Sequence, residues 1–461
     1  MSTEVIALDW LKPFSSDGGP LYLQIVTCME QAISEEQLRP GDRLPPQRLL
    51  AEHVKVDLTT VTRAYAEARR RNLLEAKGAA GTFVAAPKID LTQIIDLSMN
   101  IPPPPADIDL DDCLKRGLSQ VLMRSDVDLL MTYHLGGGSS ADRSAAALWL
   151  APMLGNVDHE RIVVCPGAQP ALAALILALT AAGDVILTEP LVYPGLLAAA
   201  TQLGRRVVAL ECDEDGALPD QLAAASRQYG ARLLYLNPTL QNPTTRTMPE
   251  TRRQEIAAVA ERLDIKIIED DPYWLFSQPA PQPLANFAPA QVFYVSTVSK
   301  CLLPGLRTAY VVMPSAVPQE PFLAALRSFV LMSTPLMSAL TTQWIHDGSA
   351  TALLNGIRAE ADMRRQLANR ILMNATPSHG GGIHLWQALP KHWLPFDFAA
   401  NARQEGLNVI SSAAFYSGKN PPPFIRISLG RAKNRFDLVV ALRRLAALLD
   451  RKMPQRREIV V

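Results

Sequence analysis

The sequence predicts an α/β protein with a mainly parallel sheet, preceded by a small helical domain and followed by a smaller α+β lobe. From about residue 96, seven short β-rich runs alternate with helix-length segments, a pattern typical of a largely parallel sheet. The runs are 161–165, 184–188, 206–210, 233–236, 265–269, 292–295 and 309–312. From about residue 321 the chain is helix-rich, and it then returns to short strands near 382–386 and 424–428.

Residues 14–85 predict a winged helix-turn-helix. Three segments place apolar residues at helical spacing, and two glycines then bracket a tight hairpin. These features are the segment 21–38, a short helix after Pro45-Pro46, a helix from Thr59-Thr60 to about Arg71, and the turn between Gly78 and Gly81 that ends in Thr82-Phe83-Val84. Three helices followed by a glycine-turned ribbon is the order of elements in that DNA-binding fold.

Prolines mark a boundary after this domain. Residues 86–105 include the run from Pro102 to Pro105, which cannot continue a helix or a central strand, so we expect a linker and Pro-rich segment there. The second domain would span 106–461, with its small C-terminal lobe at about 321–461. Because the connection is short, the two domains are expected to communicate mechanically.

Composition narrows the class of protein. The 461 residues are 48% hydrophobic and 20% charged, with 45 basic and 45 acidic residues, an ordinary soluble balance. Between Arg39 and Lys77, however, there are nine basic residues and only five acidic ones. The chain therefore contains a small basic module whose charge does not show in the net charge of the whole sequence. The five cysteines are scattered without metal spacing, and the N-terminus lacks the pattern of a signal peptide. These features predict a cytoplasmic protein with reduced thiols, no metal and no membrane span.

The most informative residue is Lys300. It follows the apolar strand 292–295 and is flanked by Thr297 and Ser299, and Arg307 lies seven positions later. An amine beside hydroxyls and a guanidinium suits an aldehyde cofactor that also carries a phosphate, because the amine can form a Schiff base while the other groups bind the phosphate. The alternative is a solvated surface lysine.

Two more candidate groups follow predicted strands, where open α/β sheets bind their ligands. Ala168 and Gln169 follow Gly167 at the start of an Ala-rich helix, whose backbone N–H groups can bind a phosphate. An ordinary tight turn is the alternative there. Asp270 ends an apolar strand, and a carboxylate at that position can keep a pyridine nitrogen protonated. A helix cap before a Pro turn fits the same residues.

Four further residues suit the same kind of ligand. Asn242 and Tyr273 can hydrogen-bond a ring oxygen, and Tyr193 can stack on a ring, although turns commonly contain such residues. Arg426 lies between apolar residues on a strand, which is costly unless it binds an anion such as a carboxylate. A structural salt bridge is the alternative for Arg426.

In their order along the chain, these elements resemble the signature of fold-type I pyridoxal 5′-phosphate (PLP) aminotransferases, over residues from about 96 to 461. The resemblance implies that Lys300 forms the internal aldimine with PLP. It further implies Asp270 on the pyridine nitrogen, Asn242 and Tyr273 on the ring oxygen, Tyr193 stacked on the ring, Ala168, Gln169, Thr297, Ser299 and Arg307 around the phosphate, Arg426 on an α-carboxylate, and Tyr133 reaching the phosphate of the partner subunit.

The chain departs from that signature at two places. Thr245 stands where the family usually has a glycine, which would alter the geometry of its loop. Asn100-Ile101 precedes Pro102 where the family often has a glycine. The second departure would re-specify the substrate pocket, so Asn100 joins Arg426 among the expected effector-binding residues.

The N-terminal motifs closely resemble the GntR winged-helix family, and a GntR head on an aminotransferase-like body resembles the MocR subfamily of bacterial regulators. The motifs are Pro40-Gly41-Asp42-Arg43-Leu44-Pro45, Arg48-x-Leu50-Ala51, Thr59-Thr60-Val61-x-Arg63-Ala64-Tyr65 and Gly81-Thr82-Phe83-Val84. The expected DNA-binding residues are Arg48, Thr59, Thr60, Arg63, Gly81 and Thr82. Leu58 and Ala79-Ala80 stand where relatives often carry basic residues, which favours apolar base contacts. The run Arg69–Arg71 is expected to be solvated.

These resemblances imply a cytoplasmic regulator that binds double-stranded operator DNA and senses a small amino compound through the Lys300–PLP aldimine. An amine would free Lys300. The rearrangement that follows would change the distance or orientation of the two DNA-binding heads in a head-to-tail homodimer. Three alternatives stay open: an active aminotransferase whose head regulates its own operon, a cofactor-free scaffold, and a regulator for which PLP itself is the effector.

Overall fold

A computed structural model of the chain describes residues 10–11, 14, 19–35, 37–39, 41–71, 73–76, 78, 81–85, 95–277, 279–372 and 381–451. The chain divides into two compact units, Met1–Gln93 and Ile94–Val461. Of the sequence predictions, the wing residues Ala79 and Ala80 and the linker residues 86–94 lie outside the described part of the chain.

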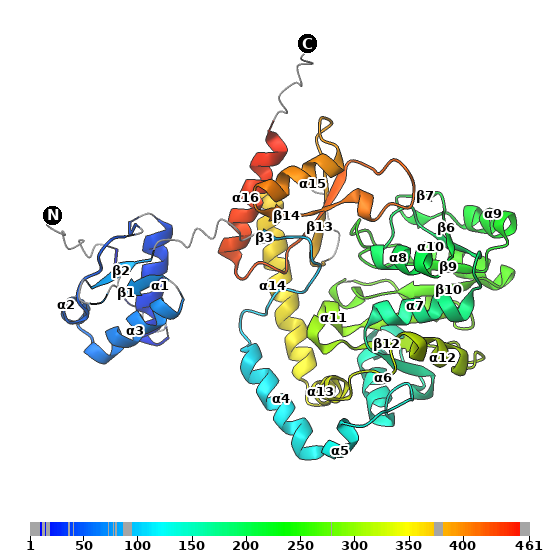
Figure 1. The fold of residues 1–461 in the computed structure, drawn as a ribbon, viewed down its shortest axis with the longest axis horizontal. Helices are drawn as coiled ribbons and strands as arrows, with labels where there is room; N and C mark the ends of the chain where they lie inside the picture. The colour runs from blue at the N-terminus through cyan, green and yellow to red at the C-terminus, as the bar shows by residue number, and fades with distance from the viewer. Residues whose placement is uncertain are drawn as a thin grey trace, which may run out of the picture. The chain divides into compact units, whose positions relative to one another are not determined.

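The smaller unit, blue in Figure 1, contains three helices and a two-stranded antiparallel ribbon. Its elements are α1 (Leu21–Ser34), α2 (Gln47–Val54), α3 (Leu58–Arg70), β1 (Leu74–Ala76) and β2 (Thr82–Val84). Helix α3 begins where the Asp57 carboxylate accepts a hydrogen bond of 2.7 Å from the Thr59 N–H group. The Tyr65 hydroxyl, buried in the core, donates to the Pro45 carbonyl at 2.7 Å and ties α3 to the start of α2. The predicted winged helix-turn-helix is confirmed.

The larger unit is built on a seven-stranded sheet with the order β4-β12-β11-β10-β9-β5-β6 (Figure 1). The strands are β4 (Ile162–Cys165), β5 (Val185–Thr188), β6 (Arg206–Ala209), β9 (Leu233–Leu236), β10 (Lys266–Asp270), β11 (Val292–Thr297) and β12 (Ala309–Val312). Strand β12 is antiparallel to both of its neighbours, and the other pairs are parallel. Each strand overlaps one of the seven predicted runs, so the predicted mainly parallel sheet is confirmed.

Helices cover both faces of this sheet because the side chains of each strand alternate between the faces. In β4, Val163 and Cys165 pack with α7 (Ala168–Leu179), α8 (Pro194–Gln202) and α12 (Glu320–Phe329). Ile162 and Val164 face the other side. Covering that side are α6 (Ser140–Leu154), α13 (Pro335–His346), α14 (Ser349–Ile371), and further along the sheet α9 (Pro219–Tyr229) and α10 (Glu250–Leu263). Helix α4 (Leu110–Arg124) packs on α13 and leads into α5 (Val127–Leu130).

The smaller lobe has its own core. Its elements are the antiparallel strands β13 (His384–Ala388), β16 (Phe424–Ser428) and β15 (Ile410–Ser411), the parallel pair β3 (Ile95–Asp96) and β14 (Leu407–Asn408), and helices α15 (Pro395–Gln404) and α16 (Arg435–Asp450). Leu97 is fully buried in this core, so the chain from residue 95 onward belongs to the larger unit rather than to a linker. After Leu97, the next buried residue of this core is Ala368 in α14, whereas the sequence placed the lobe's start near residue 321. Helix α12 instead packs on α7.

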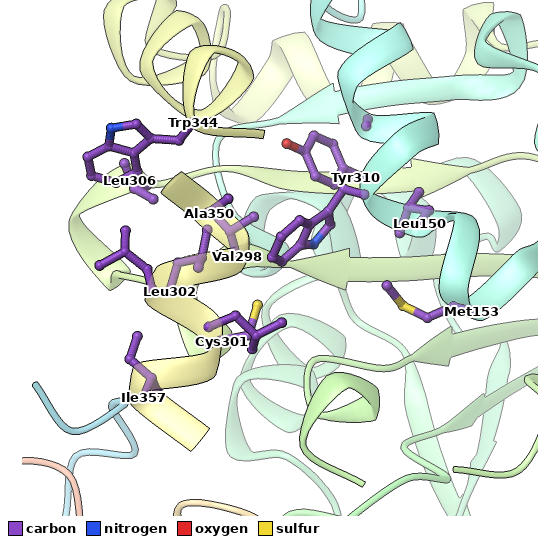
Figure 2. Packing of buried hydrophobic residues seen from close by; sticks show 14 of the residues in the cluster. Leu150, Met153, Val298, Cys301, Leu302, Leu306, Tyr310, Trp344, Ala350 and Ile357 are labelled. Carbon is purple, nitrogen blue, oxygen red and sulfur yellow. The ribbon is translucent and has the colours of Figure 1, made fainter. Parts of the chain in front are cut away.

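The helix that carries Lys300 is fixed by apolar packing of its other residues (Figure 2). This helix, α11, spans only Val298–Cys301. Its buried surroundings in the figure include Val298, Cys301, Leu302, Leu306, Trp344 and Ile357. A single helical turn is not stable by itself. The core therefore determines where the Lys300 side chain projects.

Candidate functional site

One end of the site is a cradle around the start of α7. Gly167 caps that helix with φ of 108°, and a Cβ atom at Gly167 would lie 2.9 Å from Nη2 of Arg307. The Arg307 guanidinium thus lies against the helix N-terminus, and it donates to the Pro166 carbonyl at 3.2 Å. Ser299 is buried on α11, between Thr297 and Lys300. A helix N-terminus with an adjacent guanidinium is a phosphate-binding arrangement.

The side chains of Thr297 and Gln169 are partly engaged elsewhere. The Thr297 hydroxyl donates to the Thr308 carbonyl at 3.0 Å and accepts from the Ser299 N–H group as the cap of α11. The Gln169 Nε2 atom donates to the Gly195 carbonyl at 2.8 Å, whereas its Oε1 atom is buried without a hydrogen-bond partner among the described residues. Gln169 therefore has an acceptor to offer, and Thr297 mainly holds α11 in place.

Lys300 is a buried amine beside two cations. Its Nζ atom donates to the Asn100 carbonyl at 2.6 Å. Burial, followed by repulsion from Arg426, lowers the pKa of Lys300 to about 8, while Asp270 opposes the shift. With such a pKa, about a tenth of Lys300 is neutral at pH 7, far more than for an ordinary lysine, and the neutral form is the nucleophilic form of an amine.

This pKa makes a pH prediction. We expect covalent capture of PLP by the chain, trapped with borohydride, to become about tenfold faster between pH 7 and pH 9 and then to level off, because an amine with a pKa of about 8 loses its proton over that interval. An ordinary lysine would continue to gain reactivity beyond pH 10. A rate that still rises tenfold per pH unit above pH 9 would contradict the lowered pKa.

Asp270 is held by a residue that the sequence reasoning missed. The Tyr235 hydroxyl on β9 donates to Oδ2 of Asp270 at 2.7 Å, and both side chains are buried. Burial raises the pKa of Asp270 to about 7, and the hydrogen bond from Tyr235 lowers it. The Asn237 side chain donates to the Asp270 carbonyl at 2.7 Å and accepts from the Asn242 N–H group at 2.7 Å. The carboxylate therefore has a fixed orientation and one oxygen left for a ligand.

A second network joins Tyr273 to Asn100 and His384. The Asn100 amide donates to the Tyr273 hydroxyl at 2.7 Å and lies 3.1 Å from Nδ1 of His384. His384 was not predicted. It is buried on β13, and burial lowers its pKa to about 3, so the ring is neutral and Nδ1 accepts from Asn100. Tyr273 is thus left with its own proton to donate.

Arg426 and Asn242, two of the predicted site residues, are hydrogen-bonded to each other. The Arg426 Nη1 atom donates to Oδ1 of Asn242 at 2.8 Å, its Nη2 atom donates to the Ser98 carbonyl, and the Phe415 ring lies 5.0 Å from the guanidinium carbon. Its Nε atom is buried and has no partner among the described residues. The alternative of a structural salt bridge is not what the contacts show, because all of these partners are uncharged.

Tyr193 precedes α8 and lies among the same groups. Burial, followed by the charge of Asp270, raises the pKa of Tyr193, so its hydroxyl stays protonated. A Cβ atom at Gly195 would lie 2.1 Å from Oε1 of Gln169 and 2.4 Å from the Tyr193 ring, so Tyr193 and the cradle residue are neighbours. The backbone of Val192 donates to the Phe415 carbonyl at 2.8 Å, which attaches this loop to the small lobe that carries Arg426.

Two positions depart from these groups. Tyr133 is 74% exposed and lines a separate cavity of about 790 Å³ with Ser139 and Asp142. Within one chain the structure does not bring it to Lys300, and its predicted role concerns a partner subunit. Thr245 keeps the left-handed conformation, φ 63°, that a glycine would adopt without strain. For a β-branched residue this costs about 1–2 kcal/mol, so the loop retains its geometry at the expense of stability.

The polar groups fit PLP. Three buried atoms lack partners among the described residues and face this cluster: Oε1 of Gln169, Oδ1 of Asn100 and Nε of Arg426. A phosphorylated aromatic aldehyde needs a cradle for its phosphate, a carboxylate for its ring nitrogen and an amine for its aldehyde. The start of α7 with Arg307, the Asp270 carboxylate and Lys300 supply these in turn.

The predicted DNA-binding residues lie on α2, in the first half of α3 and at the ribbon. Thr59, Arg63 and Arg48 are exposed, and Gly81, with φ of 112°, lies against the Arg43 side chain. The arginines at the end of α3 differ from these, because Glu67 pairs with Arg70 at 2.7 Å and with Arg71 at 2.8 Å. The exposed, cationic face of the unit is thus at the start of α3, the part of a recognition helix that enters the major groove.

Among the described residues, the structure contains neither a helix long and apolar enough to cross a membrane nor a cluster of metal-binding side chains.

Comparison with known families gives two matches. Residues 92–444 match the aminotransferase class I and II family, and residues 21–84 match the bacterial regulatory proteins of the gntR family. Together these segments leave only short stretches of the chain unmatched.

Some curated proteins are similar to this chain over nearly its whole length. It is 29% identical to the uncharacterized HTH-type transcriptional regulator YdeF of Bacillus subtilis, over 97% of this chain and 98% of the relative. It is 26% identical to the HTH-type transcriptional regulator TauR of Rhodobacter capsulatus, over 86% and 90%. An archaeal alanine:glyoxylate aminotransferase structure superimposes with a TM-score of 0.71 and 23% identity, over 77% of this chain and 90% of that one, which shows the fold.

Proposed function

The chain belongs to the aminotransferase class I and II family and carries a gntR-type DNA-binding domain, and from this premise we propose a bacterial transcription regulator that senses a small amino compound through PLP held on Lys300. The observation that carries the proposal is the amine of Lys300, which is buried, has a pKa lowered to about 8 and lies within reach of the charges of Asp270 and Arg426. The relatives that span the whole chain, named as transcriptional regulators, support the regulatory role. Such a protein would act in the cytoplasm, where bacterial DNA lies.

Each polar group would have one task toward the cofactor. When bound, PLP supplies an electrophilic aldehyde and an electron-withdrawing ring. The Asp270 carboxylate would hold a proton on the ring nitrogen, because the hydrogen bond from Tyr235 orients it and favours its ionised form. The Tyr273 hydroxyl would donate to the ring oxygen, and the N-terminus of α7 with Arg307 would bind the phosphate.

The amino compound would be recognised by charge. Arg426 is buried, with an unpartnered Nε atom, and suits a carboxylate bound by two N–H groups. Ligand binding would regulate DNA binding only if the two states of the protein bind the ligand unequally. We propose a homodimer with a head-to-tail arrangement, in which the exposed Tyr133 reaches the partner's site.

The test measures operator affinity directly. The PLP-loaded chain is titrated onto operator fragments from the flanking DNA of its own gene, with and without a panel of amines. An amine that changes both the absorbance of bound PLP and the operator affinity supports the sensor. If PLP alone, without any amine, changes the affinity, the cofactor is the effector instead. Operator affinity that responds to neither would overturn the proposal.

A second candidate function, aminotransferase activity, is favoured by one observation. The amine, the ring-nitrogen carboxylate and the carboxylate-binding arginine converge in one site. Incubation with amino acids and 2-oxoglutarate distinguishes the two functions. Sustained formation of keto acid at about 1 s⁻¹ or faster would establish an enzyme, whereas a single turnover per site would leave the sensor as the function.

The head supplies a matched pair of substitutions. We expect Arg63→Ala to weaken operator binding about tenfold or more, because a charged side chain at the start of the recognition helix contacts bases or phosphates. Arg70→Ala, on the same helix, removes the same charge from a residue already paired with Glu67 and should change affinity by less than about threefold. Electrophoretic mobility shifts at fixed salt measure both. Equal losses in the two variants would contradict the assigned face.

A further inference from the structure

A strap of chain, residues 96–100, is hydrogen-bonded to the site through consecutive carbonyls. The Leu97 carbonyl accepts from the Ser428 N–H group at 2.7 Å, and the Met99 carbonyl accepts from the Ser428 hydroxyl at 2.7 Å. The Ser98 carbonyl accepts from Arg426, and the Asn100 carbonyl accepts from Lys300 at 2.6 Å. The carbonyls of the strap therefore accept hydrogen bonds from both Arg426 and Lys300, the two basic side chains that an amino acid would contact in this site.

The strap is anchored by Asp96. Its Oδ1 atom accepts from the Ser98 N–H group at 2.9 Å, from the Ser98 hydroxyl at 2.5 Å and from the Met99 N–H group at 3.4 Å. The strand pairing of β3 continues in the bond from Leu97 N–H to the Asn408 carbonyl, 2.9 Å. Asp96 forms no hydrogen bond with Arg426 or Lys300 in the described residues, so its contact with the site runs through the strap, while its charge also favours the protonated form of Arg426.

A carboxylate and the strap compete for Arg426. Bidentate binding uses two neighbouring N–H groups of one guanidinium edge. On the edge formed by Nε and Nη2, the Nε atom is buried without a partner, whereas Nη2 donates to the Ser98 carbonyl. Because Nη2 carries two N–H groups, a carboxylate on that edge would share this nitrogen with the Ser98 carbonyl, and each acceptor would weaken the hydrogen bond of the other. An amine without a carboxylate would not share this nitrogen.

We propose that Asp96 is a positioning residue of the effector site, which sets how strongly the Ser98 carbonyl competes with a ligand carboxylate for Arg426. The strap would loosen when a carboxylate binds, and β3 is the first described element after the ribbon of the DNA-binding domain, so the strap would transmit occupancy of the site toward that domain. This inference rests on the proposed function.

The experiment uses the PLP-loaded full chain and two probes, L-alanine and ethylamine, which differ in the carboxylate. Their affinities are read from the absorbance of bound PLP. Asp96→Ala should bind L-alanine about fivefold more tightly than the unaltered chain, the effect of one weakened hydrogen bond to a charged group. Its affinity for ethylamine should stay within about twofold. Asp96→Asn keeps the Oδ1 acceptor and should behave like the unaltered chain.

Hydrogen exchange of the unaltered chain is the second measurement, and it does not depend on the stability of a variant. L-alanine should accelerate exchange of the amides of residues 97–99, and ethylamine should not. The inference is overturned if L-alanine leaves this exchange unchanged, if Asp96→Ala shifts both affinities equally, or if neither chain binds L-alanine. Binding of L-alanine by Asp96→Ala alone supports it.

The two proposals fail in different ways. If amines change operator affinity while the strap amides and the preference for L-alanine stay unchanged in every variant, the sensor stands and the strap does not. If the strap responds to L-alanine but operator affinity never changes with any amine, the positioning role of Asp96 stands and the sensor fails.

Discussion

Lys300→Ala is expected to abolish covalent retention of PLP and the response of operator binding to amines. The side chain is the amine that projects into the cluster of Asp270, Arg426 and Arg307, and its pKa is lowered first by burial and then by the charges of the two arginines. Without it, PLP would be held only by the cradle and by Asp270. We expect affinity for PLP to fall about 100-fold, equivalent to about 2.7 kcal/mol. Absorbance after gel filtration measures retention, and mobility shifts measure the response.

Stability separates this loss from unfolding. Because burial lowers the pKa of Lys300, folding must pay to bury its protonated form, which lowers the free energy of unfolding. This loss of stability is present in full below pH 8 and disappears as the pH rises toward the pKa that Lys300 has in the unfolded chain. Lys300→Ala removes that cost, so at pH 7 its unfolding midpoint should not fall. Lys266→Ala, which removes a lysine paired with Asp264 and Gln291 away from the site, is the control. Retention of PLP by Lys300→Ala at the unaltered level would contradict the role of the amine.

The sequence predicted the parallel sheet because its signal is local and repeated. A run of apolar residues bounded by helix-length segments needs no knowledge of distant contacts, and each of the seven runs became a strand of the sheet. The boundary of the small lobe, in contrast, depends on contacts between segments that are distant in the sequence. Helix α12 has the apolar spacing of any buried helix, and only its contact with α7 assigns it to the larger domain.

The candidate site was predictable where residues end strands. Parallel strands bring their carboxyl ends to one edge of the sheet, so Asp270 and Lys300 were expected to converge. Arg426 was added to the site because an arginine between apolar strand residues is unfavourable unless it binds an anion. Tyr235 and His384 were missed because each reads as an ordinary core residue within a strand. Tyr235 reaches Asp270 because β9 and β10 pair in one register, with Tyr235 opposite Ile268, and the sequence does not contain that register.

The strap was assigned to a linker for a related reason. The prolines that follow it, Pro102 to Pro105, correctly exclude a helix, but nothing local shows that the residues before the strap's end pair with β14, more than three hundred positions away. Asn100 was singled out only as a departure from a family pattern. Its backbone carbonyl contacts Lys300, whereas its side-chain amide contacts Tyr273 and His384. Backbone contacts of this kind carry no signature in the side chains.

The largest loss of stability is expected for Arg253→Met. Arg253 and Glu269 are both 0% exposed, 3.7 Å apart, in the core behind the strand that carries Asp270. The guanidinium also donates to the carbonyls of Met248 and Pro238 at 3.0 and 3.1 Å, which fixes the ends of the loop that contains Asn242. Removing the arginine leaves a buried carboxylate uncompensated, so the free energy of unfolding should fall by about 3–5 kcal/mol in urea denaturation.

Two further variants test whether the loss of stability comes from the buried charge. Arg252→Met, at the adjacent position, breaks ion pairs with the partly exposed Asp213 and Glu255 and should cost less than about 1 kcal/mol. Adding Glu269→Gln to Arg253→Met removes the orphaned charge and should recover about 2 kcal/mol, because breaking a buried pair costs more than replacing it. Since the backbone N–H groups of Leu284 and Ala285 donate to Glu269, glutamine can keep one of these bonds. Strictly additive losses in the double variant would show that the two residues are not coupled, and the site strand would then owe its position to apolar packing alone.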